Sequence, residues 1–119
     1  IPVVAPIGCD YRGVAYNINA DHVASKVASS IKAEKLIVLT NVSGISGKNG
    51  KLISSLSKSQ ANSLIKKGII KKGMLPKVKC LVEALSGGVA KAHIIDGRIP
   101  HAVILETFTD AGIGTEILL

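Results

Sequence analysis

The side chains best suited to chemistry near the start of the chain are two amides and a carboxylate at alternate positions. Asn17, Asn19 and Asp21 stand directly before an apolar pattern of helical period. An amide can donate to a substrate carboxylate without adding charge. Asp21 would repel such a substrate, so we expect it to orient lysines instead. The structural alternative is a turn followed by a helix with Asn19 or Asp21 as its N-cap.

A cation that suits phosphoryl transfer comes much later in the chain. Lys77 follows Gly73, Met74, Leu75 and Pro76, and a proline there suits the first turn of a helix. An ammonium beside the N–H groups of a helix start can stabilise charge on a transferring phosphoryl group. Such transfer depends mainly on positioning and electrostatics, so an amide, a carboxylate and one or two lysines suffice. The alternative is a surface lysine in a lysine-rich stretch.

Other candidate groups give weaker signals. Gly44, Gly47, Gly50 and Gly73 can line a nucleotide, but none belongs to a phosphate-binding loop of known spacing. The three histidines have no serine or cysteine partner in sequence, which disfavours nucleophilic catalysis. The two cysteines are isolated, so we expect free thiols in a reducing compartment and no metal held by the protein.

The composition indicates one globular domain with an aliphatic core. Of the 119 residues, 47% are apolar and 3% are aromatic. The aliphatic side chains suit a parallel sheet covered by helices. The scarcity of aromatic side chains argues against a protein that binds single-stranded nucleic acid by stacking. The net charge is +7, and six lysines fall between Lys66 and Lys79. They form either a solvated face or a surface for phosphorylated molecules, and nucleic acid is the less favoured partner.

No apolar run approaches the roughly 20 residues that span a membrane, so we expect no membrane contact. The chain begins at Ile1, without Met and inside an apparent strand, so we expect a missing upstream piece.

Apolar periodicity and turn residues predict strands that alternate with helices. From Asp21 a helical stripe contains Val23, Ala24, Val27, Ala28 and Ile31, and Ser57 and Gln60 have capping-box spacing. The expected strands are 1–7, 35–40, 92–95 and 116–119, with a hairpin or loop around 8–13, a turn at 96–97, and helices from 21, from 57 to about 68, from 76 to 86 and over 101–108. This order predicts an α/β protein, an αβα sandwich around a largely parallel sheet, with ligands at the carboxyl ends of its strands.

Five segments are specific enough to compare with known families: Ile-Pro-Val-Val-Ala-Pro-Ile-Gly, Tyr-Asn-Ile-Asn-Ala-Asp, Ala-Glu-Lys-Leu-Ile-Val-Leu-Thr, Gly-Met-Leu-Pro-Lys-Val and Ile-Ile-Asp-Gly-Arg-Ile-Pro-His through Gly-Ile-Gly-Thr. Together they resemble the carboxyl-terminal part of the acetylglutamate kinases, a branch of the amino acid kinase family. The resemblance implies an enzyme that phosphorylates the side-chain carboxylate of N-acetyl-L-glutamate with ATP and Mg²⁺, in arginine biosynthesis.

The same resemblance implies residue roles. Asn17, with Asn19, binds the substrate, Lys77 stabilises the transferring phosphoryl group, and Asp21 orients Lys77. The implied ATP site consists of Thr40, Asn41, Gly44, Gly73 and Met74. Two positions depart from the family pattern: Asn41 stands where aspartate is usual, and Lys72 replaces a glycine, which predicts a changed loop conformation.

The family's amino-terminal lysine, its glycine motif and its substrate-gripping arginine have no counterpart here. We therefore expect residues 1–119 to be a carboxyl-terminal nucleotide-binding domain without its substrate lobe, inactive alone. The alternatives are a non-catalytic nucleotide-binding or regulatory module and, less favoured, a basic nucleic-acid binder. The carboxyl-terminal segments resemble the arginine-inhibited, hexameric branch, which implies an effector region with His101, Glu106, Gly112 and Gly114. It also implies a homo-oligomeric full-length form, located in the cytoplasm or, in a eukaryote, a plastid.

Overall fold

The centre of the fold is a four-stranded sheet, seen in a computed structural model that describes residues 1–109 and 112–119. The strand order is β3 (Lys35–Thr40), β5 (Lys91–Asp96), β6 (Gly114–Leu118) and β4 (Ser55–Ser57). β3 and β5 are parallel, as are β4 and β6, whereas β5 and β6 are antiparallel. The largely parallel sheet confirms the predicted α/β class.

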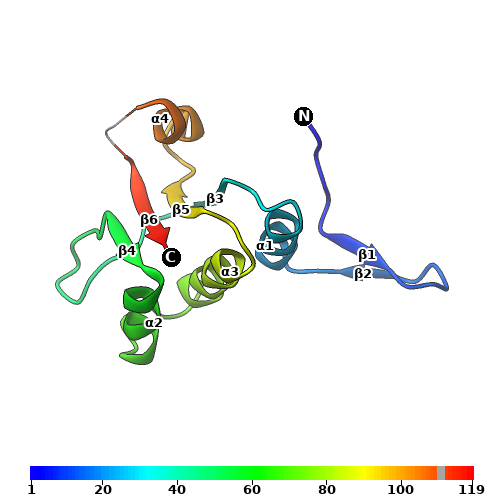
Figure 1. Cartoon of the computed structure of the whole chain (residues 1–119), viewed down its shortest axis with the longest axis horizontal. Coiled ribbons are helices and arrows are strands. Elements are labelled where there is room, and N and C mark those ends of the chain that lie inside the picture. Colours follow the sequence, from blue (N-terminus) through cyan, green and yellow to red (C-terminus); the bar gives the residue numbers. More distant parts are fainter. Residues whose placement is uncertain (110–111) are drawn as a thin grey trace.

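Helices cover the sheet from two sides (Figure 1). α1 (Ala20–Ser30), α2 (Lys58–Lys66) and α3 (Met74–Ser86) lie on one side, and the short α4 (Ala102–Phe108) lies on the other. α3 contributes most to the core: its Val78, Leu81 and Leu85 are buried against the sheet. Opposite them, Ala92 and Ile94 of β5 are fully buried. The core is aliphatic, as the composition predicts.

Local sequence signals place most of the elements. Ser57 and Gln60 form the predicted capping box at the start of α2, with both reciprocal hydrogen bonds present. α3 ends at Ser86 before two glycines, and β3 and β5 lie where short apolar runs predict strands. β4 was missed, because three residues with one apolar side chain give no periodic signal.

The strand predicted over residues 1–7 is wrong. Only β1 (Ile7–Cys9) forms there, and it pairs antiparallel with β2 (Ala15–Asn17) to make the hairpin expected around Gly8 and Gly13. In the described chain no strand flanks residues 1–6, and Pro2 and Pro6 lack the N–H that a ladder needs. The hairpin projects away from the sheet (Figure 1).

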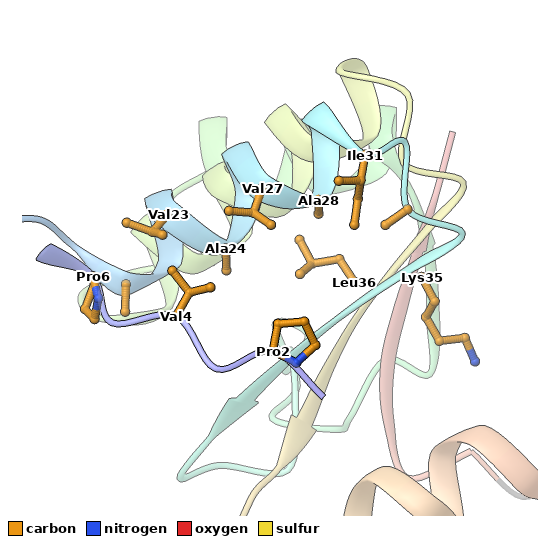
Figure 2. A pocket seen from close by; sticks show the side chains of 12 residues that line it. Pro2, Val4, Pro6, Val23, Ala24, Val27, Ala28, Ile31, Lys35 and Leu36 are labelled. Atoms are coloured by element: carbon orange, nitrogen blue, oxygen red, sulfur yellow. The ribbon is translucent and has the colours of Figure 1, made fainter. Parts of the chain in front are cut away.

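The apolar stripe predicted for α1 is present, but most of it does not enter the core. Ala28 is buried, whereas Val27 is 44% and Ile31 70% exposed. Figure 2 shows these side chains facing Pro2 and Val4 across a groove of about 470 Å³. The neighbouring β3 is an edge strand rather than the fully buried strand that its apolar run predicts.

Close backbone contact in the sheet fixes the identity of Gly114. This glycine lies opposite Ile95 in the antiparallel register of β5 and β6. A Cβ added to it would overlap the Ile94 carbonyl oxygen and lie 2.9 Å from Ile95 Cγ2. A residue expected in an effector region is therefore also required for packing.

We predict that Gly114→Ala destabilises the protein by at least about 2 kcal/mol, because the clash is with backbone and cannot relax by a rotamer change. Urea unfolding measures this cost. The matched control is Gly73→Ala, since Gly73 has φ −61 and nothing lies within 4 Å of an added Cβ. Equal stabilities of the two variants would contradict the packing account.

Candidate functional site

The site is built where α1 and α3 lie side by side (Figure 1). The buried hydroxyl of Ser25 donates to the carbonyl of Cys80 over 2.9 Å and ties the two helices together. Gly87 at the end of α3 lets them approach, because a Cβ there would lie 2.6 Å from Ser29 Oγ. Small residues at the crossing thus bring the starts of both helices together.

At this junction Lys77 meets Asp21. The ammonium donates to both carboxylate oxygens, at 3.0 Å to Oδ1 and 3.1 Å to Oδ2. The side chains are only 26% and 18% exposed, so solvent screens the pair less than it would at the open surface. The two residues singled out from distant parts of the sequence are in direct contact, and Asp21 is in a position to orient Lys77.

Asn19 is the N-cap of α1, which settles the choice between Asn19 and Asp21. Its Oδ1 accepts a hydrogen bond from the Asp21 N–H at 2.9 Å, so the cap holds Asp21 at the first turn. Asn17 ends the exposed β2 two residues earlier. Neither amide lines the pocket described next, which contains Lys77.

A pocket of about 290 Å³ opens at the carboxyl end of β3, where parallel-sheet proteins bind ligands. Its lining combines a hydroxyl, an amide, three lysines and a glycine loop. Thr40 and Asn41 come from the strand end, and Lys77 comes from the first turn of α3. The other lining residues are Val42, Lys71, Lys72, Gly73 and Met74. Such a lining suits an anionic ligand.

Gly44 belongs to an adjoining hollow rather than to this pocket. It lines a space of about 250 Å³ together with Met74, and it is buried with φ +145. A Cβ on Gly44 would lie 2.7 Å from Thr115 Oγ1. That hydroxyl accepts from the Ile45 N–H and donates to the Ile53 carbonyl. Gly44 therefore allows the loop after β3 to be clamped onto β6.

Asp96 and Arg98 stabilise the turn predicted at 96–97, although their interaction was not predicted from sequence. Arg98 donates two side-chain hydrogen bonds and one backbone hydrogen bond to Asp96, which lowers the pKa of this carboxyl to about 2. The Gly97 N–H donates to the Thr40 carbonyl at 2.8 Å. The end of β3 is thus held by the turn that follows β5.

A second polar pocket, of about 370 Å³, is lined by residues of β5, β6 and α4, on the face of the sheet that α4 covers. Glu106, Gly112 and Gly114 line it, whereas His101 is exposed at the start of α4 and does not. Three of the four expected effector residues therefore line the same pocket. Sequence reasoning missed His93, whose Nδ1 is 2.6 Å from Glu106 Oε1.

His93 is a buried histidine with one nitrogen unused. Burial lowers the pKa of His93, and this effect outweighs that of Glu106, which raises it. We therefore assign a neutral imidazole ring whose Nδ1–H donates to the Glu106 carboxylate. Nε2 has no hydrogen-bond partner among the described residues, since Glu116 Oε1 is 3.7 Å away. His93 thus places an unsatisfied, buried polar atom beside this pocket, whose lining includes the residue.

One histidine does have a cysteine neighbour, contrary to the expectation from sequence. Cys80 Sγ lies 3.6 Å from His22 Nδ1. Burial, reinforced by Asp21, raises the pKa of Cys80, so the sulfur stays protonated at neutral pH. A protonated thiol is a poor nucleophile, and nucleophilic catalysis remains disfavoured.

We predict that stability falls in mild acid because of His93. The unfolded chain takes up this proton near the ordinary pKa of 6.5, and the folded chain only at lower pH. The stabilisation is therefore complete above pH 6.5 and declines as the pH drops below it, by up to about 1.4 kcal/mol per pH unit. His93→Asn keeps a donor for Glu106 and should flatten the dependence measured by urea unfolding between pH 7.5 and 5.

His101→Asn is the matched control, because His101 is exposed and asparagine tolerates its left-handed backbone (φ 58). It should keep the full pH dependence. A His93→Asn variant with an unaltered slope would refute the assignment to His93.

Two kinds of feature are absent from the residues that the structure describes. No helix there is long and apolar enough to cross a bilayer. No group of three or more His, Cys, Asp or Glu side chains there is arranged to hold a metal ion.

Known proteins resemble this chain over nearly its whole length. It is 56% identical over 119 residues to the acetylglutamate kinase of Sulfurihydrogenibium sp. (strain YO3AOP1) and 58% identical over 118 residues to that of Persephonella marina. These alignments cover 100% and 99% of this chain, but the chain spans only 40% of the length of either relative.

A solved structure is also similar. The N-acetylglutamate synthase of Neisseria gonorrhoeae, complexed with coenzyme A and L-arginine, superimposes with a TM-score of 0.88 and is 36% identical. The match covers 95% of this chain and 26% of the synthase. Residues 1–96 match the sequence pattern of the amino acid kinase family, which is most of the chain. The chain therefore belongs to the amino acid kinase family.

Proposed function

We propose that this chain is the nucleotide-binding part of an enzyme that phosphorylates the side-chain carboxylate of N-acetyl-L-glutamate with ATP. The observation that carries the proposal is the contact of Lys77 with Asp21 at the edge of a cation-rich pocket. The identity of 56–58% to acetylglutamate kinases supports the choice of substrate.

In the proposed reaction an oxygen of the substrate carboxylate attacks the γ-phosphorus of ATP. The bond to the β–γ bridging oxygen breaks, and ADP leaves with the electron pair. Lys77 stabilises the negative charge on the transferring group, and Asp21 fixes the position of that ammonium. Thr40, Asn41 and the Gly73–Met74 loop border the nucleotide.

Mg²⁺ accompanies the nucleotide in this proposal. The pocket lining contains no carboxylate, and Asp21 is already bound to Lys77, so the described residues offer no carboxylate cage. The ion, which neutralises phosphate charge, would be held mainly by phosphate oxygens and water, as Mg²⁺ commonly is. The protein supplies the lysines that complete the charge balance.

In this proposal the acceptor substrate, N-acetyl-L-glutamate, binds outside the nucleotide pocket. Asn17 ends β2 and Asn19 caps α1, both outside the pocket lining, where they can face a carboxylate substrate. We propose that an acceptor lobe outside residues 1–119 completes the site. The chain alone then positions one reactant and has no activity, since positioning both is worth roughly 7–11 kcal/mol in favourable cases.

The second polar pocket supports an effector site for arginine. Glu106 and Glu116, which line it, can pair with a guanidinium. The likeness to a synthase solved with L-arginine favours this ligand. It also favours the second candidate function, a regulatory domain without catalysis of its own. Homo-oligomerisation and a cytoplasmic or plastid location remain predictions from sequence.

We predict that the 119-residue chain binds Mg-ATP in preference to RNA of equal charge. The pocket supplies a defined set of donors, whereas the surface lysines supply only charge. Calorimetric titrations across a range of salt concentrations distinguish the two. RNA binding with a steep salt dependence and no heat from ATP would refute the nucleotide site.

In the intact enzyme, the chain together with its acceptor lobe, we predict that Lys77→Ala lowers kcat about a hundredfold or more with little change in the KM for ATP. The lost cation acts on charge that develops in the transition state. Steady-state kinetics measures both constants. An unchanged kcat would remove Lys77 from the mechanism.

Lys79→Ala is the matched control, an exposed lysine on the same helix outside the pocket lining, and it should leave kcat unchanged. Asn17→Ala should behave differently from both. It should raise the KM for N-acetylglutamate and leave that for ATP unaltered, because Asn17 contacts the acceptor alone in the proposed site.

A further inference from the structure

Lys72 adopts a backbone conformation that favours glycine. Its φ is +47, and it is the first central residue of a turn in which the Met74 N–H donates to the Lys71 carbonyl at 3.2 Å. The conformation is disfavoured for a residue with a Cβ. In the loop before α3 a lysine thus adopts the left-handed backbone conformation. The next residue, Gly73, has a right-handed conformation instead (φ −61).

Backbone strain alone does not mark a functional residue, as Lys32 shows. Lys32 has φ +49, but it follows the end of α1, where left-handed residues commonly terminate helices. The N–H of Lys32 donates to the Ser29 carbonyl there. Lys72 precedes a helix instead, and the upstream α2 is already terminated by Gly68 with φ +66. Helix capping therefore explains Lys32 and not Lys72.

The surroundings of Lys72 supply an explanation. It lines both the pocket at the end of β3, with Thr40 and Lys77, and the adjoining hollow that contains Gly44. Lys77 is neutralised by Asp21. In the described part of the chain Lys72 has no ion-pair partner. Net positive charge at this junction therefore comes from Lys72 and its neighbour Lys71.

The two neighbouring lysines differ in where they lie. Lys71 Cε is 3.9 Å from the position of a Cβ on Gly68, and Lys71 also lines a separate hollow with Lys48 and Lys67. Lys72 lines only the two spaces that border the end of β3 and its loop. Lys72 is thus the unpaired cation confined to the proposed nucleotide site.

We propose that Lys72 binds the polyphosphate of the nucleotide and makes the site favour triphosphate over monophosphate. This inference rests on the proposed function and adds a residue to it. The lysine supplies a charge-assisted hydrogen bond that Lys77, paired with Asp21, does not fully provide. The binding affinity that Lys72 adds grows with the phosphate charge of the ligand. It is therefore largest for ATP and smallest for AMP.

The test compares Lys72→Gly with Lys32→Gly in the intact protein. Both changes remove one exposed lysine and relieve the same backbone strain, so both should raise the midpoint of thermal unfolding. Only Lys72→Gly should weaken Mg-ATP binding in calorimetry, by about tenfold or ~1.4 kcal/mol. AMP binding should change less than about twofold, and Lys72→Arg, which keeps the charge, should retain most of the ATP affinity.

The outcomes separate the two levels of the proposal. If the wild-type protein binds no ATP, the proposed function fails and this inference fails with it. If wild type binds ATP and Lys72→Gly binds it equally well, only the role of Lys72 is overturned. Equal losses for ATP and AMP, equal losses in Lys32→Gly, or no rescue by Lys72→Arg would also overturn it.

Discussion

The close crossing of α1 and α3 is the constraint on which the candidate site depends. A helix pair can bring two polar side chains together only if the backbones approach closely, and here Ser25 and Gly87 make that approach possible. The Ser25 hydroxyl satisfies a buried carbonyl as it does so. Asp21 and Lys77 each lie about one turn before this contact. Their ion pair is thus a consequence of helix packing, and loosening the crossing would separate the two charges.

The sheet adds a second level of positioning. β3 ends at Thr40, whose carbonyl is held by Gly97 in the turn after β5, and the loop that follows is held to β6 by Thr115. A strand end fixed at both its carbonyl and its following loop can present side chains to a ligand without further ordering, which lowers the entropic cost of binding. The residues that do this do not line the pocket themselves, yet the geometry of Thr40 and Asn41 depends on them.

Sequence reasoning succeeded where the signal is local. The capping box at Ser57, the helix stop after Ser86 and the apolar runs of β3 and β5 are each determined by residues within a few positions. Sequence reasoning failed where the structure of a segment depends on another segment that is distant in sequence. Residues 1–6 have the composition of a strand but no neighbouring strand in the described chain, and the α1 stripe faces a groove rather than the core. His93 was missed because its partner Glu106 is on another element and no spacing rule connects them.

The charge distribution links the lysine-rich composition to the site. Five carboxylates in the described chain, Asp21, Glu83, Asp96, Glu106 and Glu116, already face cationic or histidine partners. The lysines between α2 and α3 have no such partner there, and two of them, Lys71 and Lys72, line the pocket at the end of β3, so part of the excess positive charge lies in that pocket. A local excess attracts a small polyanion to one place and falls off within about 10 Å at ordinary salt. Cations on the rest of the surface would instead favour long polyanions such as RNA, so the position of Lys71 and Lys72 in the pocket, more than the number of lysines, favours a nucleotide.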